Sequence, residues 1–292
     1  MSKTLAVMAL SSYALMGCQI TDNKQTQPDA TASTQQAAKV SVQLWSVKDT
    51  LKQDFKGTLR QLANMGFEGV EFAGEFGPYK HDPKGLKSYL DSLGLQASGA
   101  HIDFKQFSDE QFADSVHFYQ TLGVKYLIDP WEKRAWDHTQ VASVVDDLNR
   151  LADKLEPYNM QIGYHNHQHE FADYKESTFW DYIAENTKSN VVLQQDVGWT
   201  SFAGKDPVSY VKKYPNRTIT THYKVVIPEQ NSADLSPIIG QNNGIDWYNL
   251  TQALYTDGGV QWIVLEQEDY PEGLTPLQSV KLSKLNLDKI LQ

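Results

Sequence analysis

The residues best suited to chemistry lie in the segment Gln161–Phe171, QIGYHNHQHEF, which contains three histidines and a glutamate. A strand alternates its faces with a period of two, so His165 and His167 would share one face with Gly163. Two imidazoles at a strand end suit a divalent metal, although a half-buried polar strand end can show the same pattern by chance. Three later strand ends favour the metal site: Asp196 in LQQDVGW, His222 in ITTHYKV and Glu266 in IVLEQE.

These four residues, His165, Asp196, His222 and Glu266, form a set of two histidines and two carboxylates. Mixed nitrogen and oxygen ligands suit Mn²⁺, Zn²⁺, Co²⁺ or Fe²⁺ better than Ca²⁺. If the imidazoles are neutral, the two carboxylates balance the charge of one divalent ion, and coordination positions stay open for substrate oxygens. We therefore expect one divalent metal as the cofactor.

Predicted strands alternate with predicted helices along residues 40–292. The strands are expected at 40–47, 67–73, 96–102, 125–131, 161–167, 191–197, 218–226 and 261–268. Strands that alternate with helices pair in parallel, and eight such units imply a closed (β/α)8 barrel, the TIM barrel. An open doubly wound sheet is the alternative, but no GxGxxG follows the first strand and the sequence has no P-loop.

The predicted helices begin at polar caps and carry apolar residues at helical spacing. Asp49 is expected to cap one helix that continues to Met65, and Ser108 is expected to cap another that ends at Leu122. After the sixth strand, the next helix is predicted at 207–214. The polar segment 228–244 is predicted to be a loop that could act as a lid.

In such a barrel the chemistry lies at the C-terminal ends of the strands. Aliphatic residues should face the helices, so we expect Leu193, Ile219 and Ile263 to point outward. Their alternation partners then point into the barrel: Gln194, Asp196, His222, Lys224, Glu266 and Glu268, with Glu71 and His101 from earlier strands. Burying unpaired charge is costly, so polar groups from six strands on one rim indicate a functional site.

The N-terminus is predicted to be an export signal. Lys3 precedes an apolar run from Leu5 to Met16, a length typical of the hydrophobic part of a signal peptide. The run ends in LMGC, which resembles a bacterial lipobox, so Cys18 is expected to be lipidated after residues 1–17 are removed. An ordinary cleavage site beside an incidental cysteine is the alternative.

Residues 18–39 are rich in Gln, Thr, Ala and Ser and are predicted to form a disordered tether before the barrel domain, residues 40–292. We therefore expect an exported, membrane-anchored lipoprotein that faces the periplasm or the cell surface. Its one cysteine excludes an internal disulfide. The net charge of −10 argues against nucleic acid as a partner. The oligomeric state is not predicted.

The chain from about Val40 onward resembles the xylose-isomerase-like TIM barrels, the sugar phosphate isomerase/epimerase family that also contains the apurinic endonuclease. The matching segments are GVEF at 69–72, YHNHQHEF at 164–171, DVGW at 196–199, HYK at 222–224 and VLEQE at 264–268. The resemblance implies one divalent metal held by Glu, Asp, His and Glu from strands five to eight. The last three carry over onto Asp196, His222 and Glu266.

The first family glutamate does not match, because His165 occupies its position. A related branch with HNH at this strand end looks similar, so we expect His165 to be the fourth ligand. His167 is the alternative, and Glu170 is a weaker one. Lys224 matches the family lysine, whereas Val225 stands where an aspartate often follows.

The resemblance leads to a hypothesis of metal-dependent isomerisation, epimerisation or elimination on a keto-sugar or 3-keto-glycoside. The metal would acidify the C–H beside the carbonyl, and Glu266, His101 or His167 would take the proton. Lys224 would help to stabilise the enediolate oxygen. The family's epimerases use two metal-bound glutamates, of which Glu266 alone remains here, and this departure argues against a symmetric epimerisation.

Four further side chains are predicted to contact the small-molecule sugar substrate: Glu71, Trp45, Trp131 and Trp199. For each tryptophan, packing is an equally good interpretation. Two other functions stay open at this point. One is a metal-dependent hydrolase on the same barrel, and the other is a non-catalytic carbohydrate-binding lipoprotein.

Overall fold

Eight parallel strands close into a barrel in the computed structural model, which describes residues 1–2, 37–228 and 234–292. The strands follow one another around the barrel in the order β1, β10, β9, β8, β5, β4, β3, β2. They are β1 (Lys39–Gln43), β2 (Gly69–Phe72), β3 (Gln96–His101), β4 (Tyr126–Asp129), β5 (Gln161–His165), β8 (Val192–Asp196), β9 (Thr220–Tyr223) and β10 (Trp262–Leu265). This arrangement confirms the predicted barrel and excludes the open sheet.

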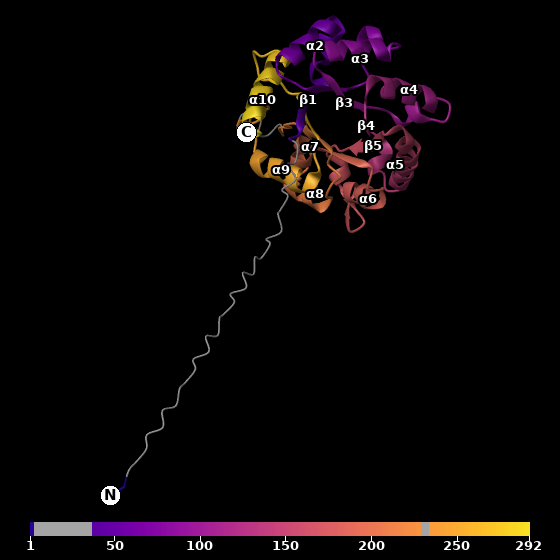
Figure 1. Ribbon diagram of the computed structural model, residues 1–292. Coiled ribbons are helices and arrows are strands. Elements are labelled where there is room, and N and C mark those ends of the chain that lie inside the picture. Colours follow the sequence, from indigo (N-terminus) through magenta and orange to yellow (C-terminus); the bar gives the residue numbers. More distant parts are fainter. Residues whose placement is uncertain (3–36, 229–233) are drawn as a thin grey trace. The chain divides into compact units, whose positions relative to one another are not determined.

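The α-helices surround this barrel (Figure 1). They are α1 (Lys48–Gln53), α2 (Phe55–Asn64), α3 (Pro83–Ser92), α4 (Phe112–Leu122), α5 (Val141–Leu155), α6 (Phe179–Asn186), α7 (Val197–Phe202), α8 (Pro207–Lys213), α9 (Trp247–Ala253) and α10 (Pro276–Ile290). Short helical turns connect them: η1 (Leu44–Val47), η2 (Gly77–Tyr79), η3 (Phe104–Phe107), η4 (Lys133–Trp136), η5 (Glu156–Tyr158), η6 (His169–Phe171) and the π-helical η8 (Leu254–Gly258). A two-stranded hairpin, β6 (Asp173–Tyr174) and β7 (Ser177–Thr178), completes the elements.

Nothing among these described elements is long and apolar enough to cross a lipid bilayer as a helix. The predicted signal peptide, Cys18 and most of the predicted tether lie outside the described residues, so they stay predictions. Part of the predicted lid segment, residues 229–233, also lies outside them.

The helix predictions were wrong at three places. The helix expected from Asp49 to Met65 is broken at Asp54, whose side chain accepts the Gly57 N–H at 2.8 Å and caps α2. The helix expected from Ser108 begins at Phe112, because Ser108 ends the turn η3 instead. Helix α7 was missed, since it starts directly after β8 with no loop between them.

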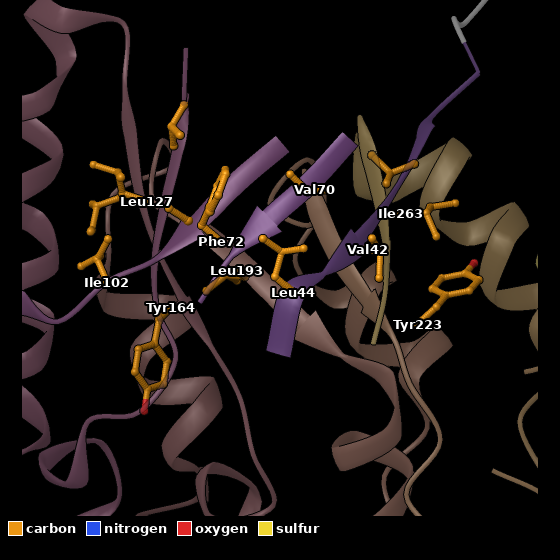
Figure 2. Close-up of a cluster of buried hydrophobic side chains, with 14 of the residues drawn as sticks. Val42, Leu44, Val70, Phe72, Ile102, Leu127, Tyr164, Leu193, Tyr223 and Ile263 are labelled. Atoms are coloured by element: carbon orange, nitrogen blue, oxygen red, sulfur yellow. The ribbon is translucent and has the colours of Figure 1, made fainter. Parts of the chain in front are cut away.

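The main core lies between the outer face of the barrel and the helices. Val70, Phe72, Leu193 and Ile263 belong to it and are at most 1% exposed. Figure 2 shows these side chains together with others of the same core. Leu193 and Ile263 therefore face outward as predicted, and their strand neighbours face inward.

A separate cluster fills the lower interior of the barrel, and we call it the floor: Tyr126, Ile128, Val192, Trp262 and Val264. Ile219 was expected to face outward, but it packs against the floor. It lies before the first residue of β9, Thr220, so the alternation of faces along that strand does not apply to it. No side chain fits at Gly163, because a Cβ atom there would lie 2.6 Å from the Ile128 Cδ1 atom. The floor is thus closely packed directly below the inward-facing polar residues.

Candidate metal centre

The four predicted ligands meet at the C-terminal mouth of the barrel. His165 and Asp196 end β5 and β8, His222 lies in β9, and Glu266 follows the last residue of β10. Each offers one ligand atom, and these atoms all lie within 4.8 Å of one another. All four side chains are buried, with residue exposures of 0–5%. Four convergent donors on four strands have the composition and spacing that one divalent cation requires.

One oxygen of this cluster is unsatisfied in a way that fits a metal. Asp196 Oδ1 accepts the Trp199 N–H at 2.8 Å, whereas the buried Oδ2 has no hydrogen-bond partner among the described residues. Burial raises the pKa of Asp196 to about 6, although Lys224 acts in the opposite direction. A buried carboxylate oxygen without a hydrogen bond is costly, and a bound cation would remove that cost.

The two histidines are held so that one nitrogen of each is available. His165 Nδ1 lies 3.1 Å from Gln194 Oε1, and His222 Nε2 lies 2.6 Å from Glu71 Oε1. Metal-binding histidines almost always donate their other N–H to such an acceptor, which fixes the tautomer. Nε2 of His165, 3.6 Å from Asp196 Oδ2, and Nδ1 of His222, 2.8 Å from Glu266 Oε2, are therefore the nitrogens directed at the other two candidate ligands.

Glu71 supports this site from below. It is fully buried, and it is not among the described residues that line the cavity above the cluster. Its carboxylate accepts hydrogen bonds from Gln43 Nε2 at 2.8 Å and Gln194 Nε2 at 2.8 Å, besides its contacts with His222 and His101. Burial opposes ionisation, but His222 and His101 lower the pKa of Glu71 below its usual value. The position of Glu71 therefore does not support its predicted contact with substrate, because other side chains occupy both oxygens.

Positive and negative groups alternate through the cluster. His222 lies between Glu71 and Glu266, and these carboxylates outweigh burial and raise the pKa of His222 to about 10. Lys224 Nζ lies 3.3 Å from Glu266 and 3.1 Å from Glu268. Although burial opposes it, the pKa of Lys224 is raised by Glu266, Asp196 and Glu268. Lys224 therefore places a fixed positive charge beside the metal ligands.

A cavity of about 580 Å³ opens above the cluster, within the range of small-molecule sites. Three of its lining groups are candidates for proton transfer: Glu266, His101 and His167. Burial and Lys224 lower the pKa of His167 to about 3, and its Nδ1 has no partner in the described structure. His101 already uses Nε2 in contacts with Gln194 and Glu71. Glu266 is therefore the carboxylate that both lines the cavity and belongs to the metal cluster.

The alternative fourth ligands lie elsewhere. Glu170 accepts the Tyr164 hydroxyl at 2.7 Å and the His167 N–H at 2.8 Å, so it holds the loop after β5. His167 lines the cavity but does not belong to the cluster of four. This geometry favours His165 over both alternatives.

The three tryptophans differ in position. Trp45 and Trp131 line the cavity and are 43% and 49% exposed. Trp199 is not one of the described lining residues, because it packs behind Lys224 and His167, with the Lys224 Nζ 5.2 Å from the Trp199 ring centroid. A stacking role for Trp199 on substrate is therefore not supported by its position.

Sequence reasoning missed Gln43, and it predicted that Gln194 points inward without giving it a supporting role. Both occupy inward positions of their strands, so the strand alternation was the available signal. Asp103 and Gln106 also line the cavity, but they lie in and beside the turn η3 that follows β3, where no periodic pattern marks them.

Comparisons with known proteins agree with this geometry. The inosose dehydratase of Lacticaseibacillus casei is 25% identical over 269 residues, which cover 80% of this chain and 89% of that protein. The crystal structure of a sugar phosphate isomerase/epimerase from Parabacteroides distasonis has 25% identity and a TM-score of 0.75, and the match covers 89% of this chain and 96% of that one.

A structure of the IolI protein with a bound zinc atom shares the fold, with 16% identity, a TM-score of 0.64 and coverage of 87% of this chain and 98% of that one. The family described as the xylose isomerase-like TIM barrel matches residues 59–285, which is more than half of the sequence. The cluster of four candidate metal ligands in the present chain lies at the mouth of a barrel of this type. The chain therefore belongs to the xylose isomerase-like TIM barrel family.

Proposed function

We propose that this protein is a metal-dependent lyase that removes a proton beside the carbonyl of a keto-sugar or 3-keto-glycoside and then expels a β-substituent. The observation that carries this proposal is the asymmetry of the site. Glu266 lines the cavity beside Lys224, whereas His165 stands at the position of the family's other glutamate.

His165, Asp196, His222 and Glu266 would hold the metal, and the buried Asp196 Oδ2, which has no hydrogen-bond partner among the described residues, is the observation that best supports a cation there. When bound, the metal supplies Lewis-acid polarisation of the substrate carbonyl. The mixed nitrogen and oxygen donors suit Mn²⁺, Zn²⁺, Co²⁺ or Fe²⁺, and they do not distinguish among these four metals.

Glu266 would take the proton from the carbon next to the carbonyl. The electron pair of the broken C–H bond then forms a C=C bond, and the π electrons of the carbonyl move onto its oxygen. The Lys224 ammonium, which is buried close to Glu266, offsets the negative charge of this enediolate. The carbonyl then re-forms while the C–O bond to the β-substituent breaks. His101 at the cavity wall would donate the proton that the departing oxygen needs, whereas His167, whose pKa is lowered to about 3 by burial, is neutral near pH 7.

Elimination fits the site better than epimerisation. An epimerase with two bases needs a proton acceptor on each face of the substrate, and here His165 has one nitrogen committed to Gln194 and one directed to Asp196. The similar inosose dehydratase supports this choice, since a dehydratase removes water by elimination. An inosose is a cyclic polyol with one ketone, which is the same class of carbonyl compound.

The experiment follows keto-sugars and 3-keto-glycosides by NMR in D₂O with Mn²⁺ or Zn²⁺. We expect deuterium to enter beside the carbonyl and the β-substituent to be released. Both should fall by at least about 1,000-fold in Glu266→Gln, as expected for loss of a general base. Glu272→Gln, which changes an exposed glutamate outside the cavity, is the matched control and should retain activity.

Deuterium exchange without release of the substituent would show an isomerase or epimerase instead. Metal binding with no exchange on any substrate would favour a hydrolase or a sugar-binding protein. Either result would contradict the lyase proposal.

We also propose that the barrel is carried outside the cell on a lipid anchor at Cys18. The LMGC segment and the polar stretch after it support this location. Mass spectrometry of the full chain expressed in bacteria should show a lipidated N-terminal cysteine in the membrane fraction. Cys18→Ala should abolish the modification, and an unmodified wild-type chain would contradict the proposal.

A further inference from the structure

A second hollow lies beside the cavity, on loops at the same end of the barrel. Its volume is about 390 Å³, and its walls come from η4, from the turn η6 and from the end of α7. Its main lining residues are Trp136, Gln168, His169, Phe171 and Phe202, with two alanines. None of these belongs to the metal cluster or lines the first cavity, so the proposed chemistry does not use this hollow.

A ridge of aromatic rings in contact with one another lies between the two spaces. Trp131 lines the cavity, and its ring lies 5.1 Å from Trp136 and 5.9 Å from His169 between centroids. Trp199 makes a second link between the two spaces. Its ring centroid lies 5.6 Å from that of His167, which lines the cavity, and 5.5 Å from that of Phe202, which lines the hollow. A molecule with two linked rings could therefore occupy both spaces by crossing the ridge.

The chemistry of the hollow fits a neutral sugar ring. Trp136 stacks on His169 with a ring separation of 4.9 Å and an interplanar angle of 28°, and Phe202 is 40% exposed. Aromatic faces bind the apolar C–H face of a sugar, and the Gln168 amide can hydrogen-bond its hydroxyls. The described lining includes no Asp, Glu, Lys or Arg, so it offers no permanently charged partner for a phosphate.

We propose that this hollow is a second sugar subsite, which binds the ring attached to the keto-sugar in a 3-keto-glycoside with two sugar units. The inference rests on the proposed function and extends it, because it assigns a disaccharide-type substrate in place of a monosaccharide. Contacts with a ring remote from the reacting carbon can be used to position that carbon, so the second ring should also raise the rate.

The test measures binding without turnover, using the metal-loaded full chain. Tryptophan fluorescence or ligand-observed NMR would compare glucose and methyl glucoside with cellobiose, maltose and trehalose. At least one disaccharide should bind about tenfold more tightly than methyl glucoside. Trp136→Ala and Phe202→Ala should remove that advantage and leave glucose affinity unchanged.

Tyr248→Ala is the matched control, since Tyr248 is an aromatic residue that is 69% exposed on α9 and lines neither space. It should change nothing. Equal affinity for disaccharides and methyl glucoside in the wild type would overturn the proposal. So would variants that weaken both classes of ligand equally. If Trp136→Ala fails to fold, as judged by its thermal melting curve, the exposed Phe202 still provides the test.

This outcome can be separated from that of the proposed function. Selective loss of disaccharide binding, with no deuterium exchange in the NMR experiment, would keep the subsite and reject the lyase. Exchange with release of the β-substituent from keto-monosaccharides, with no preference for a second ring, would keep the lyase and reject the subsite.

Discussion

The floor and the mouth of the barrel use the same strands for opposite purposes. Along β10 the inward positions are Trp262 and Val264, and Glu266 follows just after the strand. Along β8 they are Val192, Gln194 and Asp196. Each strand thus begins with an apolar residue that packs and ends with a group that can bind or transfer charge.

The floor stabilises the folded state, whereas the mouth lowers its stability. Floor side chains are buried among other apolar groups, which stabilises the folded state. The mouth buries Asp196 Oδ2 with no hydrogen-bond partner in the described structure, and its nearest charged groups, His165 and Lys224, lie 3.6 Å and 3.8 Å away. Burial raises the pKa of that carboxyl, so charge there costs free energy. A substitution should therefore affect either stability or metal binding, depending on its level in the barrel.

The largest effect is expected at the mouth. Asp196→Asn should weaken metal binding by more than about 100-fold, which exceeds the typical loss from a supporting residue. The same change should leave the metal-free protein as stable as the wild type or more so, because a neutral amide replaces a buried carboxylate. Titration with metal against a competing chelator and chemical unfolding with excess chelator would measure the two quantities.

The converse is expected for the floor. Ile128→Ala should lower the free energy of unfolding by about 2–5 kcal/mol, as buried isoleucines usually do when truncated. Metal affinity of the folded protein should change by less than about threefold, because Ile128 supplies no ligand. A large loss of metal affinity in Ile128→Ala would contradict this expectation and would show that packing in the floor affects the ligands at the mouth.

An intermediate effect is expected for Glu71, between the two levels. Glu71→Gln should lower metal affinity about 10- to 100-fold, because the amide is a weaker partner for the His222 N–H. The matched control is Glu68→Gln, since Glu68 precedes the same strand and contacts the backbone N–H of Val40 instead. Unchanged affinity in Glu71→Gln would contradict the supporting role of Glu71.

The smallest effect concerns pH. Burial raises the pKa of Glu170 from its ordinary value to about 7, and the Tyr164 hydroxyl opposes this shift. The unfolded chain therefore releases this proton first, and stability falls as pH rises from about 4.5 to 7, by at most about 1.4 kcal/mol per pH unit. Glu170→Gln should make this decline shallower in chemical unfolding between pH 5 and 8. Identical slopes would exclude Glu170 as its source.

Much of the fold and the ligand set could be predicted because both depend on alternation within single strands. Asp196, His222 and Glu266 each lie in phase with apolar neighbours that face the helices. Once a closed barrel is assumed, strand ends must meet at one rim, so residues far apart in sequence could be grouped.

The rest depends on contacts between strands, which alternation does not specify. Glu71 was predicted to touch substrate because it points inward, but its depth in the barrel follows from the stagger between neighbouring strands. Trp199 was predicted to line the cavity, and the unexpected helix α7 turns it behind Lys224. The second hollow lies on loops and short turns, where no period marks the residues.

The side-chain amide of Gln194 contacts residues on four other strands. Gln194 Nε2 donates to Glu71 and Thr220, and its Oε1 faces both His101 and His165. A single side chain therefore sets the proton positions of residues on four other strands. Evolutionary change at any of these five positions is constrained by the other four, so a descendant with a new metal preference would have to replace them as a group.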